Sequence, residues 1–210
     1  NDDDPEAITE AATRHRSVGA NYMAKVPVIE SGLEAIRWLV GKDVPICATE
    51  CFTVSQALTA CELYEGISRQ TGNHPPFFIT HITGIFDEEL QDSAERAGAS
   101  LPSEVLEQAG CIVARAIYRL IKTRGYSAVL LGGGARHARH FTEFVGGDLH
   151  ITLNWDTMRE LNDLDGPVIN RIDAETPLDV VSALSRELPD FRQAYGEGAL
   201  PPEQFKDIPA

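Results

Sequence analysis

The protein has 210 residues, 43% of them hydrophobic, and a formal net charge of -14 at pH 7. This length and composition suffice for one domain with a substantial hydrophobic core. The negative charge argues against nucleic acid as a partner, because phosphate binding needs clustered basic residues. No apolar run approaches the roughly eighteen residues of a membrane span, and the acidic residues 1–4 are unlike the basic start of a signal peptide. We therefore expect a cytoplasmic protein without a membrane segment.

The cysteines and histidines indicate neither a metal nor a redox site. The four cysteines, Cys47, Cys51, Cys61 and Cys111, lack paired CxxC spacing and fall in apolar or helical stretches, so we expect reduced core residues. The histidines show no HExxH or other ligand spacing. The sequence therefore predicts no metal and no cofactor.

Helices and strands alternate along the predicted structure. Asp4-Pro5-Glu6 supplies an N-cap, a proline at the first helical position and an acid in the first turn, which predicts a helix ending near Gly19. Further helices are predicted at residues 31–40, 54–69, 88–97, 104–123, 135–145, 155–161 and 178–187. Residues 31–40 and 104–123 have the apolar spacing of an amphipathic helix, and residues 88–97 are polar. Strands are predicted at residues 20–27, 45–52, 77–84, 127–131 and 149–154. The tail from Leu188 is predicted to be a surface-hugging or partly mobile extension.

Five apolar strands separated by helices predict an α/β fold with a parallel sheet covered on both faces. A doubly wound sheet of five strands satisfies this pattern, and so do the last five units of an eight-stranded barrel. In both architectures functional groups gather at the carboxyl ends of the strands. The candidates therefore lie in or near residues 25, 47–51, 80–84, 132–136 and 152–154.

Lys25 is one of only four lysines, and it lies in the apolar strand-like run 21–27. An ammonium taken out of water without a partner tends to lose its proton, and a neutral amine is a nucleophile. The first hypothesis is therefore a lysine that forms a Schiff base with a carbonyl substrate. The alternative is a strand-end lysine whose head reaches solvent or pairs with an acid.

Residues 47–51 end the next predicted strand. Alternation places Cys47, Thr49 and Cys51 on one side of it, with Ala48 and Glu50 on the other. The Thr49 hydroxyl could hold a water molecule near Lys25, or Thr49 could be a β-branched packing residue. Glu50 is predicted to point away from this site.

The segment Gly132-Gly133-Gly134-Ala135-Arg136 leads into a predicted helix. Free backbone N–H groups, the helix dipole and a guanidinium could converge there on an anion. The glycines could instead only allow a tight turn. Proton-transfer chemistry beside this loop would need a carboxylate or histidine opposite it, and His81 is the candidate.

Two linked segments resemble the middle of transaldolases. The first is Ala24-Lys25-Val26-Pro27 followed by Gly32-Leu33-Glu34-Ala35-Ile36, which is similar to the fourth barrel strand of that family, with its lysine, and the helix after it. The second is the run 48–57, ATECFTVSQA, which is similar to the family's Thr-x-x-Phe-Ser-x-x-Gln-Ala. Residues 132–136 resemble its Gly-Ala-Ser-x-Arg stretch, and residues 151–153 its Leu-Thr-Ile.

This resemblance implies a TIM (β/α)8 barrel with strands 4 to 8 in residues 1–187 and a C-terminal extension in residues 188–210. It implies that Lys25 forms the Schiff base, Thr49 orients the catalytic water and Arg136 binds the substrate phosphate, with Thr80 near the substrate. The implied reaction transfers or cleaves a three-carbon dihydroxyacetone unit from a ketose, a sugar phosphate or related anionic sugar. Such chemistry belongs to carbohydrate metabolism, as in the pentose phosphate pathway.

Several positions depart from the family pattern. Cys47 stands where an asparagine that touches the sugar is usual, and Gly134 replaces a serine of the substrate-binding loop. Ile85 stands where a second phosphate-binding arginine belongs. Because a bidentate guanidinium–phosphate contact is strong, we expect a substrate with a different terminal group, or one held by a single arginine.

The family's first three strands, which carry an aspartate and a proton-shuttling glutamate, correspond to sequence before residue 1. Five strands cannot close an eight-stranded barrel. We expect the remaining strands upstream or on another chain, with a homo-oligomer as one possibility, or else strand edges that are paired or covered in another way. The alternative function is a non-catalytic, barrel-like sugar-binding or scaffold protein derived from a transaldolase.

Overall fold

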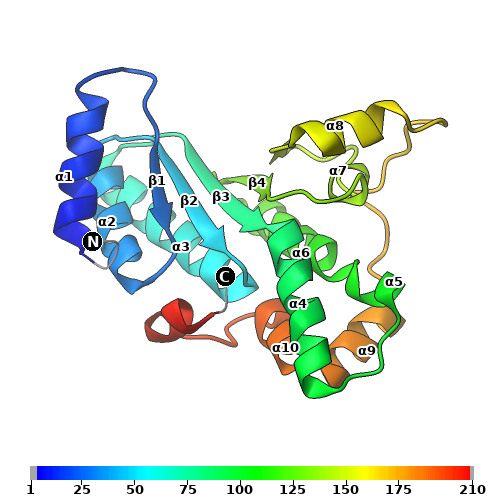
Figure 1. Ribbon diagram of the computed structural model, residues 1–210. Helices are drawn as coiled ribbons and strands as arrows, with labels where there is room; N and C mark the ends of the chain where they lie inside the picture. The colour runs from blue at the N-terminus through cyan, green and yellow to red at the C-terminus, as the bar shows by residue number, and fades with distance from the viewer. Residues whose placement is uncertain (1–3, 209–210) are drawn as a thin grey trace.

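The computed structural model describes residues 4–208 and shows a parallel sheet flanked by helices (Figure 1). The five strands follow the order β1-β2-β3-β4-β5. They are β1 (Ala24–Pro27), β2 (Ile46–Cys51), β3 (Phe77–Ile82), β4 (Val129–Gly133) and β5 (His150–Ile151). The α-helices are α1 (Pro5–Arg16), α2 (Glu30–Gly41), α3 (Val54–Thr71), α4 (Thr83–Ala97), α5 (Ser103–Leu106), α6 (Ala109–Arg124), α7 (Arg139–Thr142), α8 (Trp155–Asn162), α9 (Leu178–Glu187) and α10 (Pro189–Tyr195). A 3₁₀ helix, η1 (Pro202–Asp207), follows them.

The strand order separates the two architectures that the sequence allows. A doubly wound sheet reverses its strand order at a switch point, whereas here each strand pairs in parallel with the next one along the chain. Helices α2, α3, α4 and α6 pack against the strands, and α2 and α3 lie behind β1 and β2 in Figure 1. A consecutive parallel order with crossover helices is the arrangement of a barrel wall.

Exposure alternates along the strands, so the two faces of the sheet differ. Val26 and Ala48 point into the core and are fully buried. The strand register aligns a row of half-buried or exposed residues on the other face, which we call the open face: Lys25, Cys47, Phe78 and Val129. The expectation that helices cover both faces is therefore wrong for residues 4–208, because polar side chains occupy part of the second face.

The element boundaries confirm part of the predicted pattern. Asp4 caps α1 by accepting from the backbone N–H of Glu6 at 3.0 Å, as its sequence position predicts. The helix predicted at residues 135–145 is wrong, since α7 has only four residues. Gly132 and Gly133 belong to β4, and the break comes at Gly134, whose φ of +61° ends the extended conformation.

The tail after residue 187 is part of the core rather than a surface-hugging or mobile extension. It forms α10 and η1, and its apolar side chains are almost completely buried: Leu188, Phe191, Ala194, Leu200 and Phe205. Helix α10 packs against α3, α4, α6 and α9. The sequence analysis took Pro201-Pro202 and the scattered charges as signs of a surface segment. It did not use the three-residue spacing of Leu188, Phe191 and Ala194, which is typical of a buried helix face. Residues 1–3 and 209–210, which the sequence assigns to an acidic start and to the end of the extension, lie outside the described residues.

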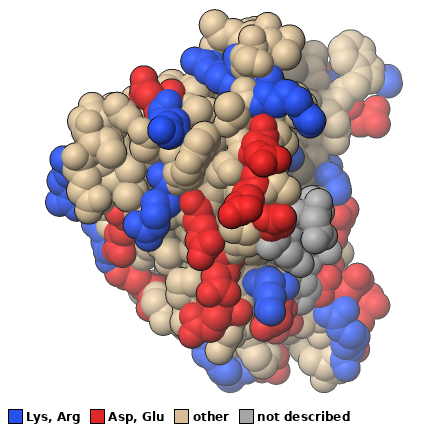
Figure 2. All heavy atoms as spheres, turned by 90° about the vertical axis from the view of Figure 1, so that its left-hand side faces the viewer, with Lys and Arg blue, Asp and Glu red and all other residues tan. Residues whose placement is uncertain are grey.

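The surface reflects the acidic composition. On the face shown in Figure 2, which is the left-hand side of Figure 1, acidic side chains form a band and basic ones lie scattered around it. Within residues 4–208, no helix combines the length and the apolarity needed to cross a bilayer.

Gly32 lets α2 start directly behind the end of β1. A Cβ atom at this position would lie 1.9 Å from the carbonyl oxygen of Pro27, which is backbone and cannot move aside cheaply. Gly41 ends the same helix, and a Cβ there would meet nothing within 4 Å. The two glycines therefore differ in purpose, since only Gly32 sets the close approach of helix and strand.

We predict that Gly32→Ala lowers the free energy of unfolding by about 3 kcal/mol, because the added methyl group overpacks a backbone contact. The matched variant Gly41→Ala should raise it by about 0.5 kcal/mol, since alanine is the better helix residue. Urea unfolding of both proteins measures the difference. Equal effects of the two substitutions would show that the Gly32 contact imposes no constraint.

Candidate active site

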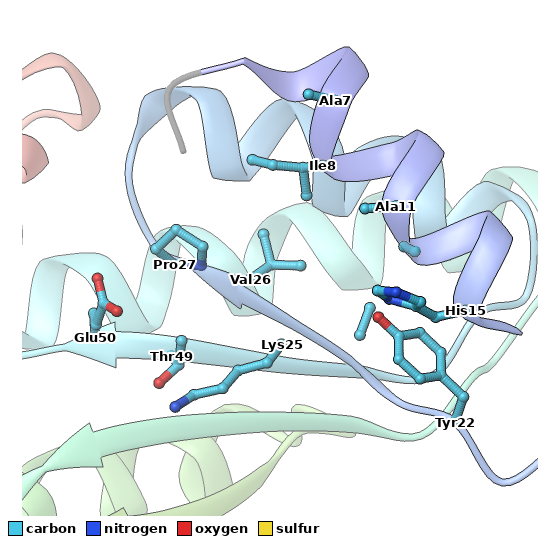
Figure 3. Close-up of a pocket in the computed structure, with 12 residues that line it drawn as sticks. Ala7, Ile8, Ala11, His15, Tyr22, Lys25, Val26, Pro27, Thr49 and Glu50 are labelled. Carbon is cyan, nitrogen blue, oxygen red and sulfur yellow. The ribbon is translucent and has the colours of Figure 1, made fainter. Parts of the chain in front are cut away.

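Lys25 is the second residue of β1, and Thr49 lies in the carboxyl-terminal half of the neighbouring strand β2. Both line a pocket of about 500 Å³ that also includes residues of α1. In Figure 3 the Lys25 amine and the Thr49 hydroxyl point toward one another. The structure thus brings together the two residues that the sequence associates with an imine and a water molecule.

Lys25 is not buried as its apolar neighbours predict. Its side chain is exposed on the open face, while Ala24 and Val26 on either side point into the core. None of the ion pairs formed within residues 4–208 includes Lys25. The apolar residues of the run 21–27 thus identify the core face of β1. They do not predict the burial of Lys25, which lies on the opposite face.

Glu50 interrupts the alternation of β2. Its φ is +55°, and the pairing of β2 with β3 shifts register between Ala48 and Cys51. Cys51 is consequently buried beside Cys61 of α3, so the prediction that it shares a side with Cys47 and Thr49 is wrong. Glu50 lines the same pocket as Thr49, but in Figure 3 its carboxylate points away from the Lys25 amine, as predicted.

The Thr49 hydroxyl is an unusual buried group. Thr49 is 2% exposed, and its Oγ1 has no hydrogen-bond partner among the described residues. A buried hydroxyl usually finds a partner, because leaving it unpaired costs free energy. The arrangement therefore leaves one donor and acceptor free beside the amine.

Cys47 and Thr80 form the next pair on the open face. The Cys47 Sγ atom lies 3.1 Å from Thr80 Oγ1, and Cys47 neighbours Lys25 in the strand register. All four cysteines are free, and burial raises the pKa of the Cys61 thiol to about 12. The Cys47 thiol thus gives the Thr80 hydroxyl a hydrogen-bond partner. Cys47 is the one of the four cysteines that is not fully buried.

Arg136 and Gly134 lie beyond the end of β4, apart from the Lys25 pocket. The Arg136 guanidinium forms a bidentate ion pair with Glu88 of α4, with Nε–Oε1 at 2.7 Å and Nη2–Oε2 at 3.3 Å. A Cβ at Gly84 would lie 2.1 Å from the Gly134 carbonyl oxygen, so the start of α4 touches this loop directly. The predicted anion cradle therefore already faces a carboxylate.

A buried Asp87–His140 pair is hydrogen-bonded to the same loop. The backbone N–H of Arg136 donates to His140 Nδ1 at 2.9 Å, which leaves the proton on Nε2 to be donated to Asp87 Oδ2 at 2.8 Å. Asp87 Oδ1 accepts from the Gly110 N–H at 2.6 Å. Burial raises the pKa of the Asp87 carboxyl above its ordinary value, although the His140 hydrogen bond acts in the opposite direction.

His81 does not face the 132–136 loop. It is fully buried on the helix-facing side of β3, where Nδ1 lies 2.9 Å from the Cys51 carbonyl oxygen. Burial lowers the pKa of His81 to about 4. The hypothesis of His81 as a proton donor beside the loop is therefore wrong, and His140 is the histidine at that place.

Gln56 ties the ends of β1 and β2 to the start of α3. Its Nε2 donates to the carbonyls of Val28 at 2.9 Å and Glu50 at 3.1 Å, and its Oε1 accepts from the N–H groups of Phe52 and Thr53. The Thr53 hydroxyl accepts from the Gln56 N–H at 3.0 Å, which completes a capping box. One buried side chain thus fixes the strand ends that follow Lys25 and Thr49.

Two comparisons with known proteins show the family of this chain. A family model described as Transaldolase/Fructose-6-phosphate aldolase matches residues 1–194. The chain belongs to this family. It is also 30% identical over 130 residues to a protein named "Probable transaldolase" from Syntrophomonas wolfei subsp. wolfei (strain DSM 2245B / Goettingen). That alignment covers 57% of this chain and 61% of the relative.

Membership of the transaldolase/fructose-6-phosphate aldolase family fits the architecture. The α/β fold with five consecutive parallel strands is consistent with a TIM barrel of the transaldolase type, so the predicted fold class is confirmed. The roles of Lys25, Thr49 and the substrate-binding candidates stay predictions.

The sequence analysis did not foresee three groups near the candidate site: Glu88, the Asp87–His140 pair and the Gln56 clamp. The first two were hidden because α4 begins at Thr83 and not near residue 88, so Asp87 and Glu88 lie within its first turns. The spacing Thr53-x-x-Gln56 is a capping-box signal and could have identified the clamp.

We predict that Gln56→Met lowers the free energy of unfolding by about 4 kcal/mol, because it leaves four backbone groups, three of them buried, without their side-chain partner. Hydrogen exchange at the Phe52 and Thr53 amides should accelerate. Gln108→Met is the control, since Gln108 donates one side-chain hydrogen bond, to the Glu104 carbonyl. A Gln56→Met protein as stable as the Gln108→Met protein would contradict the clamp.

Proposed function

We propose that the protein is a transaldolase-like enzyme that forms a Schiff base between Lys25 and a ketose and transfers or releases a dihydroxyacetone unit. The observation that carries this proposal is the placement of Lys25 beside Thr49 in one pocket, at positions that resemble the family pattern. The volume of about 500 Å³ is ample for a small sugar.

The reaction begins with attack of the Lys25 amine on the ketose C2 carbonyl, and loss of water gives an iminium ion. The iminium accepts the electron pair of the C3–C4 bond as that bond breaks and the C4 hydroxyl gives up its proton. An aldose leaves, and a three-carbon enamine stays on Lys25. The enamine carbon then attacks an acceptor aldehyde or takes up a proton, and water hydrolyses the imine.

Thr49 supports this chemistry through its free hydroxyl. Formation and hydrolysis of the imine each move a water molecule and protons near the Lys25 nitrogen. The Thr49 Oγ1, which has no partner in the described part of the chain, can hold that water against the amine. Thr49 lies on the same side of β2 as Cys47, so its side chain is directed toward the open face.

A non-catalytic sugar-binding or scaffold protein derived from a transaldolase is the second candidate. The pairing of Arg136 with Glu88 favours it, because a carboxylate already holds the guanidinium that the family pattern assigns to a substrate phosphate. Such a protein would bind sugars without forming a covalent adduct. A cytoplasmic location and an oligomer or second chain that completes the barrel stay predictions for both candidates.

The first test of function is reductive trapping. Borohydride in the presence of dihydroxyacetone should add one three-carbon adduct to the protein at Lys25, detected by peptide mass spectrometry. Lys25→Met should abolish the adduct and lower turnover by about three orders of magnitude or more. Lys42→Met, at the end of α2, is the control and should be trapped normally. A Lys25→Met protein with full activity would refute the imine.

The second test separates the Thr49 hydroxyl from its packing. Thr49→Val should change the free energy of unfolding by less than about 1 kcal/mol, because Oγ1 loses no protein hydrogen bond. Its turnover should fall about 10- to 100-fold, since the water loses its holder. Steady-state kinetics and urea unfolding give the two values. Ser68→Ala removes a buried hydroxyl of α3 and should leave turnover unchanged.

A further inference from the structure

The guanidinium of Arg136 is already engaged by groups of this chain. Its Nε and Nη2 donate to the two carboxylate oxygens of Glu88, and Nη1 donates to the Gly134 carbonyl at 3.2 Å. A planar guanidinium grips a phosphate through the same pair of parallel N–H bonds. Glu88 therefore occupies the edge that a phosphate would use.

The backbone holds Glu88 within reach of Arg136. Glu88 follows Asp87 on α4, and Asp87 is joined through His140 to the N–H of Arg136 itself. The close contact of Gly84 with Gly134 fixes the start of the same helix against the loop. Movement of Glu88 away from Arg136 is thus limited to rotation of its own side chain.

Part of the backbone around residues 132–138 is also engaged and cannot donate to an anion without losing a bond within the protein. The Arg136 N–H is taken by His140, and the Ala138 N–H donates to Glu160 Oε2 at 3.1 Å. Gly134 carries no hydroxyl, and a serine there would meet Ile82 and adopt a left-handed φ. Two backbone N–H groups at this loop are thus already engaged by side chains of the protein, and the loop lacks a serine hydroxyl.

The local charge also opposes a phosphate ester. In residues 83–88 and 132–136 the charged side chains are Asp87, Glu88 and Arg136, and Ile85 adds none. A phosphate monoester brings about -1.5 to -2 charges at neutral pH. It would have to displace Glu88 and remain beside it in a protein whose net charge is -14.

We propose that Glu88 is a specificity-determining residue that makes the Arg136 end of the site accept ketoses ending in an uncharged hydroxyl group in preference to phosphate esters. This inference rests on the proposed function, because it concerns the far end of the same sugar. A hydroxyl group can accept from Arg136 and donate to Glu88 at once, so it uses the ion pair without breaking it. A phosphate can use only one member of the pair.

The experiment compares Glu88→Gln with Glu89→Gln. Glu89 is the next residue of α4 and pairs with Arg96 at 2.6 Å, so the control removes the same charge from the same helix without touching Arg136. Turnover is measured with D-fructose and with D-fructose 6-phosphate. The wild type should favour fructose, and Glu88→Gln should raise the ratio of kcat/KM for the 6-phosphate to that for fructose at least tenfold. Glu89→Gln should leave the ratio within twofold.

Binding of inorganic phosphate gives a readout that does not depend on turnover. By isothermal titration, Glu88→Gln should bind phosphate at least tenfold more tightly than the wild type and Glu89→Gln. Equal phosphate affinity in all three proteins, or a wild type that prefers the 6-phosphate, would overturn the role of Glu88. In that case the exposed ion pair opens for phosphate without a measurable penalty.

The outcome of trapping keeps the two proposals apart. Dihydroxyacetone has no terminal group beyond its three carbons, so its borohydride adduct at Lys25 reports on the imine alone. Trapping with unchanged phosphate affinity in Glu88→Gln would retain the function and reject the specificity. No trapping, with tighter phosphate binding in Glu88→Gln, would reject the function and retain the electrostatic role of Glu88.

Discussion

The geometry of the site depends on one buried amide. Gln56 accepts two backbone N–H groups at the start of α3 and donates to two carbonyls at the ends of β1 and β2. Because three of these four groups are buried, each of the three would lose its water on folding and needs a partner inside the protein. One side chain bonds all four groups and so fixes the ends of β1 and β2 relative to each other. The row that carries Lys25 and the bulge that follows Thr49 are positioned by the same contact.

The two ends of the site are built in opposite ways. At the Lys25 end the amine is exposed and the buried Thr49 hydroxyl has no hydrogen-bond partner among the described residues. At the Arg136 end the guanidinium and the backbone N–H already have partners, in Glu88 and His140. A buried or engaged polar group stabilises the protein but has less to offer a ligand. The groups around Lys25 and those around Arg136 therefore differ in how far protein partners already engage them.

The sequence predicts this fold better than it predicts the site. Alternating apolar strands and periodic helices locate β2, α3, β3 and α9 closely, because burial on one face imposes a regular pattern. The pattern failed at Glu50 and at residues 135–145, where left-handed backbone at Glu50 and Gly134 changes the direction of the chain. A positive φ on a glutamate has no signature in hydrophobic spacing. The burial of the tail was missed for a related reason, since its prolines mark turns and hide the apolar residues between them.

The contacts of some site residues could be predicted from the sequence, whereas those of others could not. Lys25 and Thr49 lie within the two segments that resemble the family and are positioned by strand geometry, which is local. The Arg136–Glu88 pair joins residues 48 positions apart, and its formation depends on α4 starting five residues earlier than the polar pattern suggests. Long-range pairs of this kind set the charge that a substrate meets. For enzymes, interactions remote from the reacting bond contribute to kcat/KM as well as to binding. The family motif around Lys25 can therefore be retained while the contacts of Arg136 change, because the first are local and the second join residues far apart in the sequence.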